Sequence, residues 1–334
     1  MQKTRLIVLT AFLAFTIATR SASAADTLSL TVISNKHLYV PNEVVYVSGS
    51  LMWLPHTIPV NDGLVGVEVR DPLGLPFILR TRPTGTITSQ KWTMNFTQFY
   101  PCDSNSVPRY SFRRGETLYI FAEVKNFDEM LPHSAVICIV LYDANSVPIG
   151  IWHPASGTIS PGAVSAVFFQ SVTLSGSAFS GNLTLYAGVF SDFPKNGGYP
   201  YCPERTTTFT ASTSQFSSQS RTDSSNAPFA TEGAYDLSFK FPISGARTGN
   251  YTAYVSTFYY DTLGTSNFEF TFSLIGDING DGAVDIYDAI LLAATYNITP
   301  GGLRWDSRAD LNQDKVVDIY DAILLASHYG ESAL

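Results

Sequence analysis

The same ten residues, VDIYDAILLA, occur twice near the end of this 334-residue chain, at 284–293 and 317–326. Each copy continues an acidic segment that begins seven residues earlier, so that oxygen-bearing groups stand at positions 1, 3, 5, 7, 9 and 12 of a twelve-residue loop. In chain order these positions are Asp277, Asn279, Asp281, Ala283, Asp285 and Asp288 in the first loop, and Asp310, Asn312, Asp314, Val316, Asp318 and Asp321 in the second. Side-chain oxygens at this spacing, together with the backbone carbonyl of position 7, surround a hard cation. The repeat therefore predicts two calcium ions, one in each loop.

An acidic cluster of this kind can also be an ordinary solvated turn, but two copies with matched ligand positions favour metal binding. Position 6 makes a sharp turn, often with positive φ, and is Gly282 in the first loop but Lys315 in the second. A left-handed Lys315 would cost about 1 kcal/mol, so we expect tighter binding in the first loop. Short helices are expected at 287–296 and 320–329, and they should pack only when metal offsets the repulsion among the aspartates.

Upstream of the loops the pattern is that of strands, with short runs rich in Val, Tyr, Phe and Thr between Gly, Pro and Asn. The predicted strands are 28–33, 44–48, 65–69, 118–124, 135–142, 166–169, 183–190, 235–241, 251–258 and 268–274. No amphipathic helix interrupts them, which is typical of antiparallel sandwiches. We expect a mainly β fold with two immunoglobulin-like β-sandwiches, followed by a small α-helical calcium module.

The distribution of these strands indicates how they are grouped. Residues 27–88 and 228–274 each hold too few strands for a closed sandwich, whereas 98–212 holds enough for one. The Ser/Thr-rich stretch 206–225 suits a return connection. The predicted organisation is a signal peptide at 1–25, a discontinuous sandwich at 26–97 plus 226–274, an inserted sandwich at 98–212, a Ser/Thr-rich connection at 213–225 and the calcium module at 275–334. Three consecutive small β units are the alternative.

The first residues predict export. A basic start is followed by an apolar run at 6–19 and by Ala22-Ser23-Ala24, as in a cleaved signal peptide. An uncleaved anchor is the alternative, but about 14 apolar residues are fewer than the roughly 20 that span a bilayer. Cleavage would remove three basic residues and take the net charge from -8 to about -11. Because no basic stripe is present, we expect no nucleic-acid partner.

Three cysteines limit the chain to one disulfide. Cys138 lies in a run that is apolar on both faces and is expected to be a buried free thiol. Cys102 and Cys202 lie in Tyr-Pro-rich stretches near the two ends of the inserted sandwich, and we expect them to form the bridge. Four Asn-x-Thr sequons are candidate glycosylation sites, at Asn95, Asn182, Asn250 and Asn297.

The segment from Gly276 to Gly330 resembles a type I dockerin, the docking module of cellulosome-like assemblies. The resemblance rests on the two loops, their 33-residue offset, Asp in place of Glu at position 12, and a strand where a usual EF-hand has an entering helix. In that family, positions 10 and 11 help to bind cohesin, the partner module. Here they are Ile286-Tyr287 and Ile319-Tyr320, which implies an apolar contact that either repeat could make. Alternatively, these side chains face the module's own core or the neighbouring sandwich.

The sequence contains no zinc-protease motif, no nucleophile-elbow motif and no phosphate-binding motif, and its five histidines are isolated from one another. A pair of glycosidase carboxylates could still meet in space. We expect a non-catalytic, secreted or cell-surface protein that docks on a cohesin-like partner or on a second copy of itself. The alternative is an accessory subunit of a polysaccharide-degrading complex, with a glycan bound by Trp92, Phe96, Phe99, Tyr100, Trp152 and Tyr199–Tyr201. Those aromatic residues could equally fill a sandwich core.

Overall fold

The computed structural model describes residues 27–87, 92–174, 181–212, 232–242 and 246–333. Within these ranges the chain is mainly β, with two short α-helices near the C-terminal end. Each of the ten predicted strands overlaps a strand of the structure. The expected fold class is therefore confirmed as a mainly β chain with a small helical module. The predicted signal peptide and the 213–225 connection lie outside the described residues.

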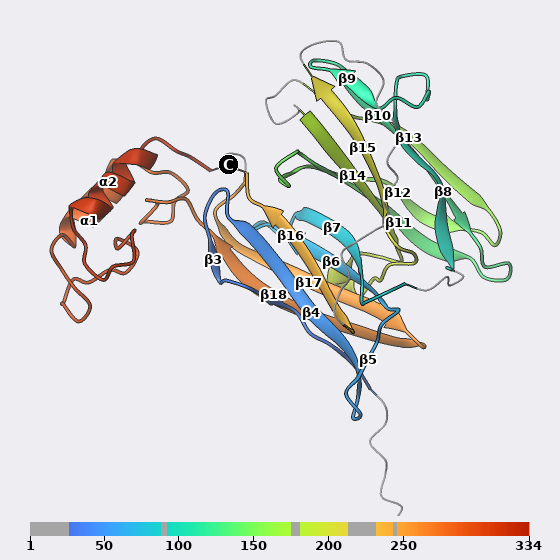
Figure 1. Cartoon of the computed structure of the whole chain (residues 1–334), viewed down its shortest axis with the longest axis horizontal. Helices are drawn as coiled ribbons and strands as arrows, with labels where there is room; N and C mark the ends of the chain where they lie inside the picture. Colours follow the sequence, from blue (N-terminus) through green and yellow to red (C-terminus); the bar gives the residue numbers. More distant parts are fainter. Residues whose placement is uncertain (1–26, 88–91, 175–180, 213–231, 243–245, 334) are drawn as a thin grey trace, which may run out of the picture.

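The first sandwich is built from two parts of the chain that are far apart in sequence (Figure 1). One sheet contains β1 (Thr27–Leu30), β2 (Ile33–Ser34), β4 (Val44–Leu54), β5 (Ile58–Pro59) and β16 (Ala234–Lys240). The other has the order β3 (Leu38–Tyr39), β18 (Thr262–Phe272), β17 (Gly249–Tyr259), β6 (Leu64–Arg70) and β7 (Pro76–Pro83). The strands before residue 84 thus pair directly with strands after residue 233.

The second sandwich is formed entirely by the segment between β7 and β16. Its smaller sheet has the order β13 (Val164–Thr173), β10 (Thr117–Asn126) and β8 (Met94–Cys102). Its larger sheet has the order β12 (Pro148–Ile159), β11 (His133–Tyr142), β14 (Gly181–Phe190), β15 (Arg205–Ser212) and β9 (Ser111–Arg113). A short 3-10 helix, η2 (Pro194–Asn196), lies between β14 and β15.

The two sandwiches share one strand topology, so the inserted unit repeats the architecture of its host. The order β3-β18-β17-β6-β7 in the first corresponds, strand by strand, to β9-β15-β14-β11-β12 in the second, and β1-β4-β16 corresponds to β8-β10-β13. In the two corresponding five-stranded sheets the short edge strand pairs in parallel, β3 with β18 and β9 with β15. The β6–β7 and β11–β12 hairpins also share the same type of turn. In each, an aspartate, Asp71 or Asp143, accepts hydrogen bonds from the amides two and four residues later.

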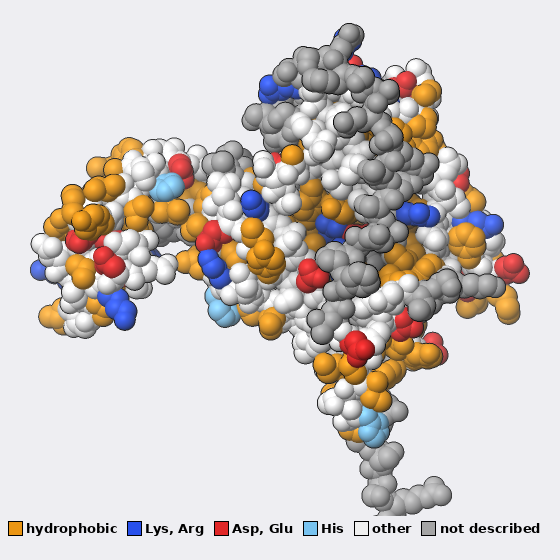
Figure 2. Space-filling model, viewed as in Figure 1, with side chains coloured by type: hydrophobic (Ala, Val, Ile, Leu, Met, Phe, Trp, Pro, Cys, Tyr) orange, Lys and Arg blue, Asp and Glu red, His pale blue; other side chains and the backbone are white. Residues whose placement is uncertain are grey.

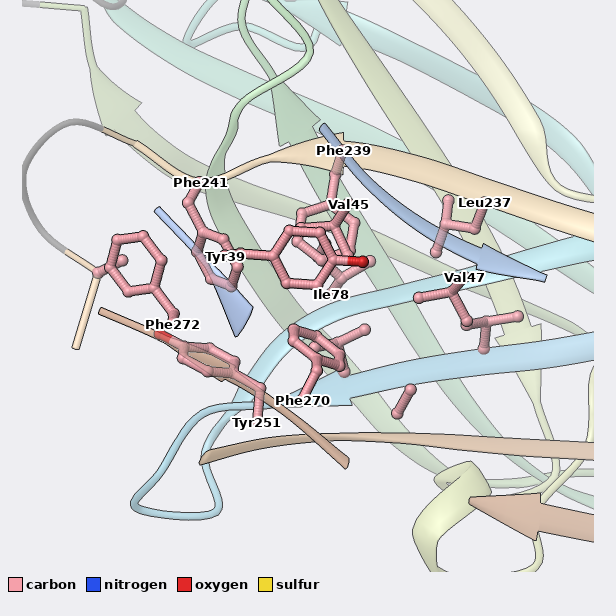
Figure 3. Close-up of a cluster of buried hydrophobic side chains, with 14 of the residues drawn as sticks. Tyr39, Val45, Val47, Ile78, Leu237, Phe239, Phe241, Tyr251, Phe270 and Phe272 are labelled. Atoms are coloured by element: carbon pink, nitrogen blue, oxygen red, sulfur yellow. The ribbon is translucent and has the colours of Figure 1, made fainter. Parts of the chain in front are cut away.

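Alternating side chains fill the core between the sheets of the first sandwich. Val45 on β4 pairs with Phe239 on β16, Val47 lies on the same face of β4, and Tyr251 on β17 pairs with Phe270 on β18 (Figure 3). All five side chains are buried, as the period-two pattern of the strands requires. Since these residues come from both halves of the discontinuous sandwich, neither half can form this core alone.

The structure differs from the expected organisation in two places. β8 begins at Met94 and pairs with β10, so this strand crosses the expected boundary between residues 97 and 98. β15 occupies Arg205–Ser212, so the first part of the Ser/Thr-rich stretch 206–225 is a strand and not a connection. Threonine has a high β propensity, and the alternation of buried and half-buried residues along β15 decided the outcome. The strands β7 and β12 also escaped the sequence prediction.

The predicted disulfide between Cys102 and Cys202 is wrong, because all three cysteines are free and buried. Cys102 ends β8, whereas the thiol of Cys202 lies near the backbone of Phe96, close to the other end of that strand. Six residues of extended strand span about 20 Å, far beyond the Cα separation of a disulfide. Burial raises the pKa of both thiols to about 12. Cys138 on β11 is a buried free thiol, as expected.

A buried ion pair joins the two sandwiches. Arg80 on β7 donates from Nε and Nη2 to the two carboxylate oxygens of Glu204, at 2.8 and 2.6 Å, and its guanidinium lies 3.3 Å from the ring centroid of Tyr186 on β14. Burial opposes the charge on Arg80, yet the Glu204 carboxylate holds its pKa above the usual value. Two-point pairing of this kind fixes orientation. Nearby, Tyr199 stacks on Phe258, which adds an aromatic contact across the same interface.

The C-terminal module contains α1 (Ile286–Ala294) and α2 (Ile319–His328) and lies beside the β3–β18 end of the first sandwich (Figure 1). β18 ends at Phe272, and the Ser273 amide donates to the Tyr39 carbonyl. Leu274 and Ile278 then enter the same buried apolar cluster as the sandwich core. The module is therefore joined to the sandwich without an intervening flexible linker. No helix in the described ranges is long and apolar enough to cross a membrane.

Candidate calcium loops and docking face

The first loop is organised around two buried aspartates. The carboxylate of Asp277 accepts from the amides of Gly280 and Gly282, at 2.8 and 3.0 Å. Asp288 is fully buried and accepts from the amides of Ile278 and Asn279 through one oxygen, and from Asp285 through the other. Burial, followed by the nearby Asp288 and Asp281, raises the pKa of Asp277. Positions 1 and 12 of the loop thus bring negative charge into a poorly hydrated site.

The second loop repeats this arrangement but has no glycine at positions 4 and 6. Asp310 accepts from the amides of Asp314 and Lys315, at 3.1 and 3.0 Å. Asp321 is fully buried and accepts from the amides of Asn312 and Asp318. Lys315 has φ 73°, as expected for position 6, and Gln313 at position 4 has φ 61°. The corresponding residues of the first loop are glycines with φ 88° and 79°, which adopt this conformation without strain.

Each loop ends in a helix that begins with a capping box. Asp285 caps α1 by accepting from the Tyr287 amide, while the side chain of Asp288 accepts from the Asp285 amide. Asp318 and Asp321 make the same two bonds at the start of α2. The aspartates at positions 9 and 12 therefore also stabilise the helix N-termini, through the amides and the helix dipole. This second role was not part of the sequence prediction, although the D-x-x-D spacing carries it.

The donors in the two loops fit calcium. They are hard carboxylate, amide and carbonyl oxygens, and within the described residues no Lys, Arg or His side chain forms an ion pair with the loop aspartates. In the same part of the chain, no three His, Cys, Asp or Glu side chains come together around one point. Several loop carboxylate oxygens instead accept hydrogen bonds from loop amides. When bound, calcium would supply the positive charge that the buried Asp277, Asp288, Asp310 and Asp321 lack.

The first loop is enclosed by other parts of the chain. The Val284 amide donates to the carbonyl of Glu331, and the Ala333 amide donates to the carbonyl of Gly282, at 2.8 and 2.7 Å. A Cβ added to Gly282 would lie 3.2 Å from Oγ1 of Thr248, next to β17 of the sandwich. Within the described residues, no backbone hydrogen bond from the sandwich or the tail reaches the second loop, where Val317 instead exchanges hydrogen bonds with Asn297 and Ile298. The first loop is thus tied to both the sandwich and the chain end.

The positions expected to contact a partner are exposed. Ile286 and Ile319 are 55% and 53% exposed, and Tyr287 and Tyr320 are both 63% exposed. They therefore face neither the module core nor the neighbouring sandwich. Other large apolar residues on these helices or just after them are exposed too. We use the name docking face for the set Ile286, Tyr287, Ile290, Tyr296, Ile319, Tyr320, Ile323 and Tyr329. Apolar side chains are prominent on the module surface in Figure 2.

A groove runs between α1 and α2, with a volume of about 820 Å³. It is lined by matched residues 33 positions apart, namely Ala289, Leu292, Ala293 and Tyr296 from the first repeat and Ala322, Leu325, Ala326 and Tyr329 from the second. The leucines are buried, whereas Ala293 and Ala326 are exposed at the surface. The duplicated sequence has therefore produced a groove in which both sides present the same residues.

The aromatic residues considered for glycan stacking lie elsewhere. Phe96 and Tyr201 are buried, and Trp92, Phe99, Trp152 and Tyr199 pack against the second sandwich core. Tyr100, which also belongs to the expected set, stacks on Phe121 on the outer face of the β8–β10–β13 sheet, where Tyr119 and Phe168 form a second stacked pair. Of the sequon asparagines, Asn182, Asn250 and Asn297 are exposed and Asn95 is half-buried.

Comparisons with known proteins bear on the C-terminal module. Residues 275–329 match the family model of the type I dockerin domain. No curated protein matches the chain. Among solved structures, the C-terminal domain of Wzt is 12% identical with a TM-score of 0.31, covering 42% of this chain and 86% of that one.

Two glycosidases are similar over a smaller share of their length. The β-glucuronidase of Bacteroides uniformis is 8% identical, with a TM-score of 0.28 over 51% of this chain and 27% of that one. The β-glucosidase of Listeria innocua is 16% identical, with a TM-score of 0.24 over 36% and 16%. This chain thus spans less than a third of either enzyme, and TM-scores this low say nothing about its function. The loops, the capping boxes and the family match together identify residues 275–329 as a type I dockerin domain.

Proposed function

We propose that this chain is a non-catalytic, secreted assembly protein whose dockerin domain binds two calcium ions and docks on a cohesin-like partner. Type I dockerin domains bind calcium and cohesins, and proteins that carry them are typically extracellular. The observation that carries the proposal is the exposure of Ile286-Tyr287 and Ile319-Tyr320 at the duplicated positions 10 and 11. Exposed apolar pairs at the entry of each helix need a partner to cover them.

The charge distribution indicates the chemistry of that partner. The only acidic residues within α1 and α2 are Asp288 and Asp321, both fully buried, and neither helix contains Lys, Arg or Glu. The contact would therefore rest on burial of Ile and Tyr side chains, with little contribution from ion pairs. Binding should consequently depend weakly on salt concentration once calcium is bound.

Capture from extracellular material tests the proposal. Residues 26–334 are immobilised with calcium or with a chelator, and wild type is compared with Ile286→Asp/Ile319→Asp. A protein with a cohesin-like sequence, retained only with calcium and lost in the variant, is the expected result. Leu303→Asp, in the exposed spacer between the loops, is the matched control and should retain the partner. Equal retention by both variants would refute docking through positions 10 and 11.

The sandwiches suit the role of a rigid support. The Arg80–Glu204 pair fixes the second sandwich on the first, and the dockerin domain continues from the first without a linker. Such a chain would hold whatever its partner binds at a defined distance and angle. Replacing Arg80 by Ala should leave the poorly hydrated Glu204 with the more distant Arg82, whose Nη1 lies 3.5 Å away, and cost about 2 kcal/mol of stability.

Carbohydrate binding is the second candidate, and the stacked rings on the β8–β10–β13 sheet favour it. Tyr119 and Phe121 on β10 point to the outer face, where Phe168 is 43% exposed. Aromatic rings on an open sheet can contact the apolar faces of sugars. Retention of the chain on insoluble polysaccharide, lost in Phe121→Ala/Phe168→Ala, would support an accessory role. No retention on a panel of plant and microbial polysaccharides would remove it.

A further inference from the structure

The docking face combines two apolar ridges with the groove between the helices. On α1, Ile286 and Ile290 stand one turn apart and form an apolar ridge, and Ile319 and Ile323 form the same ridge on α2. The groove between the helices is lined near its surface by alanines, including Ala293 and Ala326. Small residues in a groove let the ridge of another helix approach closely. Ridge and groove are therefore present side by side on one surface.

We infer that the docking face pairs with the same face of a second copy of this chain, in a two-fold dimer of helical hairpins. The inference deepens the proposed function and rests on it, because the same exposed helices would dock on the partner. A two-fold interface requires one patch that is complementary to itself. The apolar ridges and the groove lie on one patch, so the ridge of each copy can enter the groove of the other.

The exposed area is sufficient for such a dimer. The four isoleucines and four tyrosines of the docking face are 40% to 63% exposed. At roughly 180 Å² for a large apolar side chain, they amount to about 800 Å² of apolar surface, which is the area each partner contributes to a standard interface. Monomeric proteins seldom leave so large an apolar patch uncovered.

No charged side chain on the docking face opposes its pairing with a second copy. Neither helix carries an exposed acid or a Lys or Arg, so two copies would bring no like charges together within the contact. Outside the face, residues 275–334 contain ten acidic and three basic residues. Bound calcium would lower the repulsion between two such modules. Since the dimer covers Ile286 and Tyr287, self-pairing and docking on a partner would exclude each other.

The molar mass of residues 26–334 in calcium, measured by sedimentation over a range of concentrations, tests the inference. We expect a shift from monomer to dimer with a dissociation constant in about the micromolar range. Ala293→Glu/Ala326→Glu places two carboxylates in the groove at exposed helical positions, and Ile290→Asp/Ile323→Asp places them on the ridges. Both should weaken the dimer by more than about 100-fold, because burying unpaired charges is costly. Leu303→Glu/Ser307→Glu adds the same charge to the exposed spacer and should dimerise like wild type.

The outcomes separate this inference from the proposed function. Circular dichroism and the calcium-induced rise in melting temperature check that each variant is folded. A wild-type chain that stays monomeric, or a dimer that persists in both helix variants, overturns the inference. Retention of a cohesin-like partner by the immobilised monomer would then leave the proposed function intact. A dimer broken by both variants, from a chain that captures nothing, would support the inference and count against the proposed function.

Discussion

The two calcium loops carry the same ten-residue end but are held differently. The first has glycine at both left-handed positions and is enclosed by the chain end and by Thr248 of the sandwich. The second has Gln313 and Lys315 at these positions, and its Val317 backbone pairs with Asn297 and Ile298 rather than with the chain end. A left-handed non-glycine residue costs about 1 kcal/mol. Identical ligands can therefore have different affinities, because the loop backbone and its surroundings differ.

The largest effect is expected at position 12. Asp288→Ala removes a calcium ligand and leaves three amides without their acceptor, which should lower the free energy of unfolding by about 3 kcal/mol. Asp321→Ala should do the same to the second site, with a smaller loss because Asp321 accepts from two amides where Asp288 accepts from three. Denaturant unfolding with calcium and with chelator measures both. Asp306→Ala, outside either loop, is the control, and equal losses from Asp288→Ala and Asp321→Ala would contradict the comparison.

The chain end should act on one site alone. A chain that stops at Gly330 loses the hydrogen bonds of Glu331 and Ala333 to the first loop, and these contribute about 1 kcal/mol each. Calorimetric titration should show the first affinity falling about 30-fold while the second stays unchanged. If both affinities fall together, the tail stabilises the module as a whole, and the enclosure of the first loop does not account for a difference in calcium affinity.

Exchanging the residues at position 6 should make the calcium affinities of the two sites more similar. Lys315→Gly relieves the left-handed strain and should raise the second affinity about fivefold. Lys315→Ala separates strain from charge, since it removes the ammonium group and keeps the Cβ atom. Gly282→Lys should weaken the first site by more than this, because a Cβ there meets Thr248. Two sites of equal affinity in the unaltered chain would refute the predicted order.

The smallest effect is expected at position 4. Gln313→Gly relieves a left-handed residue without changing charge, while glycine makes the metal-free loop more mobile and offsets part of the gain. The second affinity should rise about twofold to threefold in the same titration. A gain larger than that of Lys315→Gly would show that position 4 limits the loop.

Local features of the module could be predicted from the sequence because ligand spacing, left-handed turns and capping depend on residues close together in the chain. The positive φ of Lys315 followed from its place in the loop, and both helices lie within two residues of their predicted bounds. The hydrophobic pattern also predicted most strands. It missed β15, where threonines gave a composition typical of a connection, and it missed β8, which begins four residues before the expected start of the inserted sandwich at 98.

The tertiary structure alone decided which distant segments meet. Cys102 and Cys202 looked like a bridge because both flank one unit, yet they lie near opposite ends of β8. Ile286 could have been core or surface on its sequence, and its exposure followed from how the helices pack on each other. The sequence by itself determined the ligands and their spacing, whereas packing over long separations determined the cysteine distance, the enclosed first loop and the groove. Such contacts depend on the relative placement of whole sheets and helices, which a local pattern does not encode.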